Sequence, residues 1–333
     1  ELESHLAERG PAWASPITGV PAEDIIAFAR LYGETKKSFI RVGYGFSRSR
    51  NGSANVHAVS CLPAITGAWQ YRGGGALHTN RALYASIDQT LIKGLDIRDR
   101  ASRPLDMCRI GPILTGDQES LHGGPPVTAM LVQNTNPADV APDTNSIIKG
   151  FLREDFFLCV HEQFMTTTAQ YADIVLPATM FLEHEDYYRG GGHMYLQVHR
   201  PVIKPFDECR SNHDVICALG QRLGSNHPGV YMSGVELIDE SLTRSGLPGF
   251  EEAADMRWID MSLEWEEAHF LDGFGHVDGR FHFSPDWSEL GADFEIMPTL
   301  PDHLDNIDEV TEEKPFRLVV PPARRFLNST FTE

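Results

Sequence analysis

The sequence predicts an α/β fold in which short parallel strands are flanked by helices. Within residues 127–179 the chain runs three times from a short apolar segment into a polar turn and a helix-like segment. These apolar segments are hydrophobic throughout rather than alternating, which is typical of parallel strands buried on both faces of a sheet. With 333 residues, the chain is also long enough to form two domains or two lobes.

The elements of this central stretch follow from its apolar runs and turn signals. The first run ends at Asn134–Pro137, a turn signal, and Asp143 and Thr144 are candidate caps of the helix that follows. The expected elements are a strand over Val127–Gln133, a helix over Asp143–Leu152, a strand over Phe156–Val160, a helix over Thr166–Tyr171 and a strand over Ala172–Leu176, which Pro177 stops.

Two turns of this stretch carry the residue types of a ligand site. In open parallel sheets, ligands bind at the carboxyl ends of the strands, where the turns lie. The turns Gln133–Pro137 and His161–Thr166 contain amides, a carboxylate and hydroxyls that can read a nucleotide base and its ribose. Neither turn has the glycine-rich fingerprint of ordinary dinucleotide-binding folds.

Further elements are predicted on both sides of the central stretch from apolar periodicity and capping residues. The expected elements are a helix over Pro21–Glu34, a strand over Ser38–Gly43, a helix over Ala54–Gly67 capped by Asn51 or Ser53, helices over Ser211–Leu223, Gly234–Ser245 and Phe250–Glu267, a hairpin around Asp278–Gly279 and a strand over Phe316–Val320. The loop from Gly43 to Gly52 carries glycines and arginines and can cradle a phosphate, although a flexible connector has the same composition.

Composition excludes several classes of function. Lys and Arg total 28 against 47 Asp and Glu, giving a formal charge of −19, which argues against nucleic acid or anionic membrane as partners. No apolar run is long enough to insert into a membrane. The five cysteines lack any CxxC pairing, so the chain has no zinc or iron–sulfur signature of its own, and we expect buried free thiols.

The ends of the sequence indicate a piece of a longer protein. The chain begins ELESHLAERG, without an initiating methionine, and ends inside a motif. We therefore expect an internal fragment, in which the absence of a targeting segment says nothing about the compartment. Cytoplasm and periplasm both remain open, with the cytoplasm favoured.

Several ordered motifs resemble one known family. TTTAQYADIVLPATMFLEHEDYY, GGGHMYLQ and RPVIKPFDECRSNHDVICALGQRLG are similar to segments of the molybdopterin oxidoreductases, the superfamily of dimethyl-sulfoxide reductase and formate dehydrogenase. VQNTNPADVAPD resembles the family's N-P turn, and RFLNSTF resembles the opening of its C-terminal dinucleotide-binding domain. The resemblance runs from about Ile17 to Phe331 and is specific to the family but not to a substrate.

The resemblance implies a domain plan. It predicts Rossmann-like parallel sheets flanked by helices, arranged in two lobes and followed by the truncated start of a C-terminal β-barrel-like domain. Residues 1–108 would belong to one α/β lobe that binds a pterin dinucleotide, and residues 109–182 to a second, mononucleotide-binding lobe. Residues 183–310 would form an interlobe and helical segment, and residues 311–333 the start of the truncated C-terminal dinucleotide-binding domain.

The resemblance also implies an activity. The chain would be the central portion of a molybdenum or tungsten oxidoreductase of the anaerobic dehydrogenase type, with two molybdopterin guanine dinucleotides as cofactors. It would move an oxygen atom or a hydride equivalent, with two electrons, to or from a small-molecule substrate. An electron-transfer subunit or other redox partner would exchange the electrons. Formate is not supported as substrate, because Arg81 in GGGALHTNR matches the formate-specific pattern only loosely.

Parts of the family's machinery would lie outside this chain. A 4Fe-4S cluster and the protein ligand to the metal would belong to a preceding region, so this fragment alone would be inactive. No catalytic residue and no metal ligand is assigned within it.

Candidate cofactor-binding residues are carried over from the matching motifs. Glu162 matches the acidic residue that holds the guanosine ribose, although many relatives have aspartate there, and Thr166 matches the threonine beside it. Asn134, Asn136 and Pro137 match the other nucleotide-facing turn. The alternative is that these residues simply cap turns and helices.

Two further groups of residues are weaker candidates. Gly43 and Gly45 match a loop beside one pterin dinucleotide. The other group, in the wall between the pterins, consists of Glu183, Gly192, His193 and Gln197. A metal site built from Glu183–Asp186 and His193 is disfavoured, because adjacent residues on an extended chain point to opposite faces. Glycoside chemistry by the carboxylates of this run is disfavoured because such runs are common, and His276 and His282 are expected to be surface or packing residues.

Two other classes of function remain open from the sequence. One is a structural or electron-transfer subunit that keeps the fold without the pterin. The other is a simple nucleotide-binding module that works without a metal. The polar residues Asn136, Glu162 and Thr166 are all present, which favours the enzyme over the pterin-free subunit.

Overall fold

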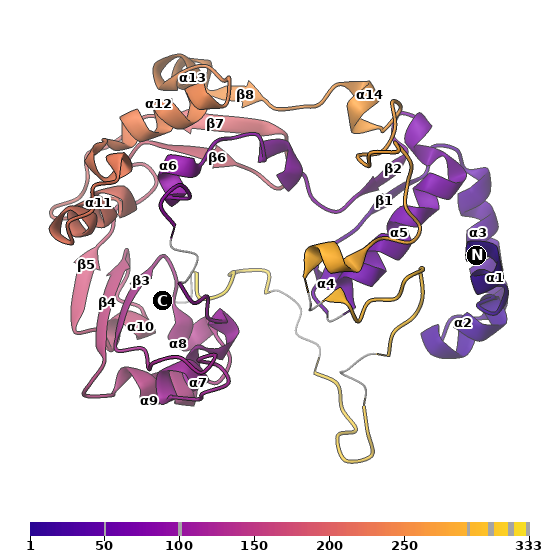
Figure 1. Ribbon diagram of the computed structural model, residues 1–333, viewed down its shortest axis with the longest axis horizontal. Helices are drawn as coiled ribbons and strands as arrows, with labels where there is room; N and C mark the ends of the chain where they lie inside the picture. The colour runs from indigo at the N-terminus through magenta and orange to yellow at the C-terminus, as the bar shows by residue number, and fades with distance from the viewer. Residues whose placement is uncertain (50, 99–101, 292–293, 306–309, 319–322, 331–333) are drawn as a thin grey trace. The chain divides into compact units, whose positions relative to one another are not determined.

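The structure is a computed structural model that describes residues 1–49, 51–98, 102–291, 294–305, 310–318 and 323–330 (Figure 1). The chain divides into two compact units. Unit 1 comprises residues 1–83, 191–193 and 262–319, and unit 2 comprises residues 84–190, 194–261 and 320–333. Both units are mixed α/β and both contain parallel strands.

Unit 2 contains the predicted parallel sheet. Its strands are β3 (Ala129–Gln133), β4 (Phe157–Glu162) and β5 (Ile174–Pro177), hydrogen-bonded in that order and all parallel. Each strand lies within two residues of the bounds expected from the apolar runs. The apolar runs and the turn signals between them are therefore sufficient to locate this sheet.

Short helices connect these strands. They are α7 (Ile110–Thr115) before β3, α8 (Pro137–Val140) and α9 (Thr144–Phe151) between β3 and β4, and α10 (Thr167–Gln170) between β4 and β5. Asp143 caps α9 by accepting the N–H of Ser146, and Thr166 caps α10 by accepting the N–H of Ala169. Both caps stand where the sequence predicted a helix to begin.

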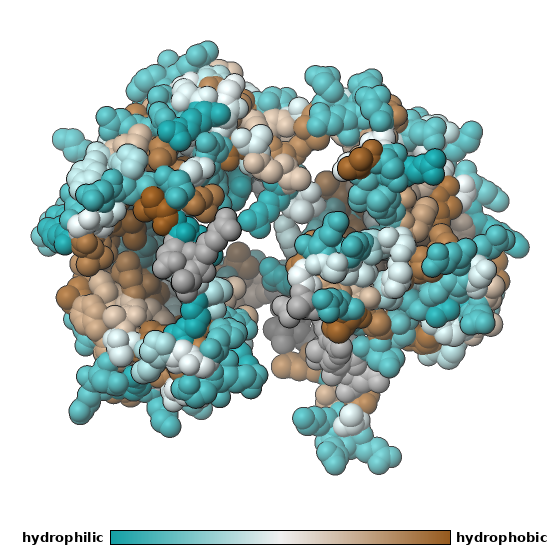
Figure 2. All heavy atoms as spheres, viewed as in Figure 1, coloured by the Kyte–Doolittle hydropathy of each residue, from teal (hydrophilic) through white to brown (hydrophobic). Residues whose placement is uncertain are grey.

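The expectation that this sheet is covered on both faces is wrong for the described residues. Leu131 is 37%, Phe157 46% and Ile174 46% exposed, and Figure 2 shows hydrophobic surface over this part of unit 2. Crossovers between parallel strands are right-handed. With the strand order β3-β4-β5, both crossovers therefore lie on the same face, and the helices of these crossovers cover one side of the sheet.

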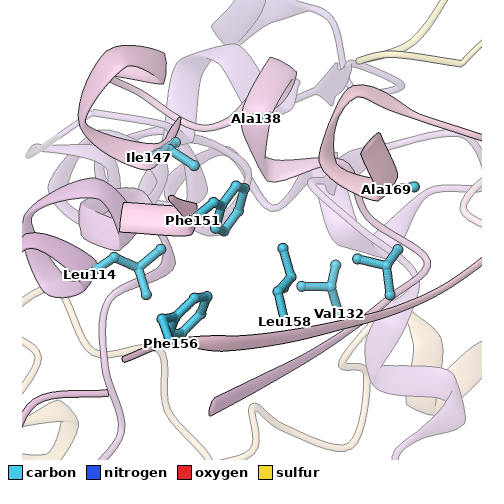
Figure 3. Close-up of a cluster of buried hydrophobic side chains, with 9 residues drawn as sticks. Leu114, Val132, Ala138, Ile147, Phe151, Phe156, Leu158 and Ala169 are labelled. Atoms are coloured by element: carbon cyan, nitrogen blue, oxygen red, sulfur yellow. The ribbon is translucent and has the colours of Figure 1, made fainter. Parts of the chain in front are cut away.

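The covered face forms the core of unit 2 (Figure 3). Its buried side chains are Leu114, Val132, Ala138, Ile147, Phe151, Phe156, Leu158, Val160 and Ala169. The rings of Phe151 and Phe156 stack with their centroids 6.3 Å apart. Gly150 brings α9 against α7 so closely that a Cβ at this position would overlap the side chain of Leu114. A residue without a side chain is therefore required at this contact.

A second, antiparallel sheet in unit 2 was not predicted. It consists of β6 (Asp186–Arg189), β7 (Tyr195–His199) and β8 (Trp258–Asp260). The single helix expected over Phe250–Glu267 is wrong. Helix α13 (Phe250–Met256) ends at Arg257, whose φ is +69°, and β8 then pairs with β7 before the short α14 (Trp265–Ala268). Pairing with a distant strand overrides the local helical pattern.

The remaining helices of unit 2 lie beside the antiparallel sheet (Figure 1). They are α6 (Thr90–Lys93), α11 (Asn212–Arg222) and α12 (Gly234–Arg244), with the 3-10 turn η4 (Pro228–Tyr231). Another 3-10 turn, η3 (Met107–Arg109), directly precedes α7. Helices α11 and α12 each begin with a capping box, Ser211 with Asp214 and Ser233 with Glu236. The expected start of α11 at Ser211 is confirmed, and Gly224, with φ +79°, follows its end.

Unit 1 is built on a pair of parallel strands with helices. Its elements are α1 (Leu2–Ala7), α2 (Pro11–Thr18), α3 (Ala22–Glu34), β1 (Phe39–Arg41), α4 (Tyr44–Ser47), α5 (Gly52–Thr66), η1 (Ala68–Gln70), β2 (Gly75–Leu77), η2 (Arg81–Tyr84, ending in unit 2), α14 and η5 (Trp287–Leu290). The loop expected after β1 contains the helical turn α4. Asn51 occupies the N-cap position of α5, but its side chain binds the carbonyls of Leu304 and Asp305 instead.

Two expectations for the last third of the chain are wrong for the described residues. Around Asp278–Gly279 the chain forms a turn, in which Gly279 donates to the carbonyl of His276, without paired strands. The strand expected over Phe316–Val320 is not formed at residues 316–318, and Val320 lies outside the described residues. Among the described residues, neither segment pairs with another strand, so neither forms a strand despite its residue types.

The cysteines are unpaired, and their burial is uneven. Cys61 is buried in α5, and burial raises the pKa of its thiol to about 11. Cys108 is exposed and Cys159, Cys209 and Cys217 are partly exposed, so the expectation of buried thiols is met only at Cys61. Among the described helices, none combines the length and apolar character needed to cross a membrane.

Candidate functional site

A cavity of about 380 Å³ lies at the carboxyl ends of β3 and β4 in unit 2. Four of the predicted cofactor-binding residues line it, namely Asn134, Asn136, Glu162 and Thr166. Pro137 is buried at the first position of α8, beside the cavity wall. The carboxyl ends of neighbouring parallel strands meet at one edge of a sheet, and this is why two turns 28 residues apart in the chain face one cavity.

Asn136 holds these two turns together. Its Oδ1 accepts the N–H of Thr168 at 3.1 Å and the hydroxyl of Thr168 at 2.7 Å. Its Nδ2 donates to Asp139 at 2.6 Å, and the hydroxyl of Thr167 donates to the same carboxylate at 2.9 Å. Asn136 is only 4% exposed, so its amide stabilises the frame of the cavity.

Glu162 presents a carboxylate to the cavity from the last position of β4. Its Oε1 accepts the N–H of Gln163 at 2.7 Å, which fixes the direction of the carboxyl group. Gln163 in turn donates to the carbonyl of Thr179 at 2.9 Å, and the hydroxyl of Thr179 lies 2.8 Å from Nδ1 of His184. This chain of contacts continues the cavity wall from β4 to the segment before β6.

Several lining residues were not predicted from the sequence. His184 comes from the segment before β6, Asp186 is the first residue of β6, and Asn212 comes from the first turn of α11. The same three residues also line a neighbouring cavity of about 450 Å³ with the apolar side chains Ile216 and Leu237. The sequence drew attention to the run Glu183–Asp186 only as a disfavoured metal or glycoside site, and the fold brings these residues and Asn212 together from elements far apart in the chain.

Asp186 is a half-buried carboxylate at this shared wall. Burial raises its pKa above the ordinary range of an aspartate, against the opposing effect of the hydrogen bond from the N–H of Tyr187 at 2.8 Å. A carboxyl group whose pKa is raised on folding contributes stability below its unfolded pKa of about 3.9 and loses that contribution as the pH rises through the folded value. The ionised form of Asp186 therefore lowers stability at neutral pH.

We expect Asp186→Asn to raise the midpoint of thermal unfolding at pH 7. Asparagine keeps an acceptor for Tyr187 and carries no charge to desolvate. Wild type and variant should converge below about pH 4, where the carboxyl group is protonated in both states. Thermal unfolding between pH 4 and pH 8 measures this difference.

Asp155 provides the control of opposite sign. Its pKa is lowered by the hydrogen bond from Arg153, so Asp155→Asn should leave stability at pH 7 unchanged or slightly reduced. An Asp186→Asn protein that unfolds at a lower temperature than wild type at pH 7 would contradict the assignment of Asp186 as a destabilising, site-facing charge.

The other predicted residues are not part of this cavity. Both carboxylate oxygens of Glu183 are used within the protein, by the N–H of Phe206 at 2.7 Å and of Met180 at 2.6 Å, and the side chain is 7% exposed. Gln197 is exposed on β7. Gly43, Gly45 and His193 belong to unit 1, and Gly192 lies in the same exposed 191–193 segment as His193. Their role toward a cofactor stays a prediction.

The electrostatics of the cavity restrict its ligand. Its described lining includes the carboxylates of Glu162 and Asp186 and contains no lysine or arginine. Carboxylates, amide oxygens and threonine hydroxyls accept hydrogen bonds from ribose hydroxyls and from the N–H groups of a base. Phosphate groups would be repelled here, so the cavity suits the uncharged nucleoside part of a nucleotide.

Among the described residues, no group of three or more His, Cys, Asp or Glu is arranged to hold a metal ion.

Comparison with known proteins identifies the family. The model of the family "Molybdopterin oxidoreductase" matches residues 26–222, more than half of the chain. The chain belongs to the molybdopterin oxidoreductase family. This confirms the family that the sequence motifs indicated, and residues 26–222 include the whole parallel sheet of unit 2 and the turns that line the cavity.

Individual relatives agree with this membership. The chain is 35% identical over 336 residues to "Probable oxidoreductase YoaE" of Bacillus subtilis (strain 168), covering 100% of this chain and 48% of that protein. It is 30% identical over 227 residues to "Dimethyl sulfoxide reductase DmsA" of Escherichia coli (strain K12), covering 64% of this chain and 28% of that protein. The chain thus spans less than half of the length of these two members of the family.

A solved structure supports the fold. "Acetylene Hydratase from Pelobacter acetylenicus" superimposes with a TM-score of 0.64 and 18% sequence identity, over 93% of this chain and 46% of that one. At this level of identity the likeness shows a shared fold and carries no information on the reaction.

Proposed function

We propose that this chain is the central portion of a molybdenum or tungsten oxidoreductase with molybdopterin guanine dinucleotide as cofactor. In this proposal the cavity of unit 2 holds the nucleoside end of one cofactor molecule. The observation that carries it is the position of Glu162 and its polar neighbours at the carboxyl edge of a parallel sheet, in a chain of this family. When bound, the cofactor supplies the transfer of two electrons together with an oxygen atom or hydride equivalent.

The residues of the cavity fit a nucleoside. Its volume of about 380 Å³ lies within the range of about 300–1,000 Å³ typical of small-molecule sites. Glu162 can accept both hydroxyls of a ribose, and its direction is already fixed by the N–H of Gln163. Asn212 and the backbone of Asn134, whose φ is +56°, supply further donors and acceptors toward the base.

The finer parts of the proposal concern the whole protein. They are a second pterin dinucleotide, a 4Fe-4S cluster, a redox partner and a small-molecule substrate, together with a C-terminal β-barrel-like domain that begins within residues 311–333. The small-molecule substrate is supported by relatives that are named for small molecules, such as "Trimethylamine-N-oxide reductase" of Haemophilus influenzae. The other parts rest on the resemblance of the sequence motifs to the family.

We expect Glu162→Gln to lower the amount of pterin and metal that the full-length protein retains. The substitution replaces the charged carboxylate that would accept hydrogen bonds from the ribose hydroxyls by a neutral amide. Hydrogen bonds to charged groups contribute about 1.5–3 kcal/mol, roughly twice as much as neutral ones, so the loss of the charge should lower affinity about 3- to 10-fold. Pterin fluorescence after oxidation and metal analysis by mass spectrometry, both per mole of purified protein, measure the change.

Glu154→Gln is the matched control, because Glu154 is exposed in the same unit and does not line the cavity. Equal pterin content in the Glu162→Gln and Glu154→Gln proteins would refute the assignment of the cavity to the cofactor.

A further inference from the structure

His161 is a fully buried imidazole behind the cavity. It lies on β4, one residue before Glu162, and its exposed fraction is 0%. Its Nε2 lies 3.1 Å from the carbonyl oxygen of Arg210, and its Nδ1 lies 3.1 Å from Nε2 of Gln133. The side chain itself does not line the cavity.

These two contacts, with the amide of Gln133 oriented as in the structure, fit one tautomer of the ring. A carbonyl oxygen only accepts hydrogen bonds, so Nε2 of His161 carries the hydrogen and donates it to Arg210. The other nitrogen then has a lone pair, and Gln133 donates an amide N–H to it. The tautomer with hydrogen on Nε2 satisfies both partners. With hydrogen on both ring nitrogens, Nδ1–H and the amide N–H of Gln133 would be two donors facing each other.

The two partners of His161 lead directly into the other walls of the cavity. Gln133 precedes the turn that begins with Asn134, and Arg210 precedes Ser211 and Asn212 at the start of α11. Arg210 is also anchored through its backbone. Its carbonyl accepts the N–H of Thr179 at 3.1 Å, and its own N–H donates to the carbonyl of Pro177 at 3.1 Å.

His161 therefore joins three segments that are separate in the chain, at the ends of β3 and β4 and the start of α11. Each of these segments supplies lining residues to the cavity. Because the ring is rigid and both its nitrogens are used, it fixes the separation between Gln133 and Arg210. A small shift in that separation displaces the turn of Asn134 relative to Asn212.

We propose that His161 is a positioning residue of the cofactor cavity. Through its two ring nitrogens it holds the end of β3 and the start of α11 at the spacing that the nucleoside requires, without touching the ligand. This inference rests on the proposed function, since the ligand in question is the nucleoside end of the pterin cofactor.

Three variants of the full-length protein test the proposal. His161→Leu removes both hydrogen bonds, whereas His161→Gln keeps one donor and one acceptor in a neutral side chain. Val160→Ala is the control for stability, because Val160 is the neighbouring residue of β4, is 0% exposed and belongs to the core instead of the cavity. All three are analysed for pterin content per mole and for hydrogen exchange of their backbone amides.

We expect His161→Leu to retain about 10-fold less pterin than wild type, which corresponds to the loss of two hydrogen bonds of ordinary strength. His161→Gln should recover most of this loss, and Val160→Ala should retain pterin close to the wild-type amount. In His161→Leu, amide exchange should accelerate at residues 177–179 and 210–214 more than in the core of β4.

The outcomes distinguish the two proposals. If His161→Leu and Val160→Ala lose pterin in proportion to their thermal stability, His161 has only a structural role and the positioning proposal is overturned. Equal loss in His161→Gln and His161→Leu would also overturn it. If the wild-type full-length protein holds no pterin, the proposed function itself fails.

Discussion

Asn136→Ala is expected to lower the free energy of unfolding of unit 2 by about 3 kcal/mol. The substitution leaves the buried N–H and hydroxyl of Thr168 without their acceptor, and each unsatisfied buried group costs about 1–3 kcal/mol. Asp139 also loses a donor at 2.6 Å. Amide hydrogen exchange of residues 157–162, measured in urea, reports the opening of the sheet that this network supports.

Asn145→Ala serves as the control for this change, because Asn145 is exposed on α9. Its free energy of unfolding should stay within about 0.5 kcal/mol of wild type, as is usual for surface positions. If both variants have the same stability, the network around Asn136 does not hold the two turns together.

Gly150→Val is expected to destabilise unit 2 by about 3 kcal/mol. The new Cβ would overlap the side chain of Leu114, so α9 must move away from α7 and open the core that they share. Overpacking of this kind costs about 1–3 kcal/mol, and the loss of packing by Phe151 adds to it. The preference of valine over glycine in a helix offsets a few tenths of a kcal/mol.

Urea unfolding of Gly150→Val, compared with Lys149→Ala, measures this cost. Lys149 is exposed on the same helix, so its replacement changes helix propensity without affecting the core. A Gly150→Val protein as stable as Lys149→Ala would show that α7 and α9 do not pack as closely as the structure indicates.

The parallel sheet of unit 2 was predictable because its signals are local. Val127–Gln133 and Phe156–Val160 are uninterrupted apolar runs, each stopped by a polar turn, and they became β3 and β4 within two residues. The placement of Asn134 and Glu162 in one cavity follows from the rule that carboxyl ends of parallel strands share an edge. Family membership was predictable from the order of the motifs.

The antiparallel sheet and half of the cavity wall were not predictable, because they depend on distant pairings. Trp258–Asp260 follows a segment with helical periodicity and becomes a strand only by pairing with Tyr195–Gln197. Asp186 and Asn212 reach the cavity through that sheet and through α11. Glu183 has the residue type of a ligand contact, yet its carboxylate binds two backbone N–H groups inside the protein.

Analysis of the full-length protein for metal, pterin and guanine nucleotide tests the central claim most directly. Molybdenum and tungsten are measured by mass spectrometry, pterin by fluorescence after oxidation, and GMP after acid hydrolysis. The account predicts about one metal ion, two pterins and two GMP per polypeptide, because two molybdopterin guanine dinucleotides would hold one metal ion in the proposed enzyme. A correctly folded full-length protein with neither metal nor pterin would contradict the account and favour a subunit that keeps this fold without the cofactor.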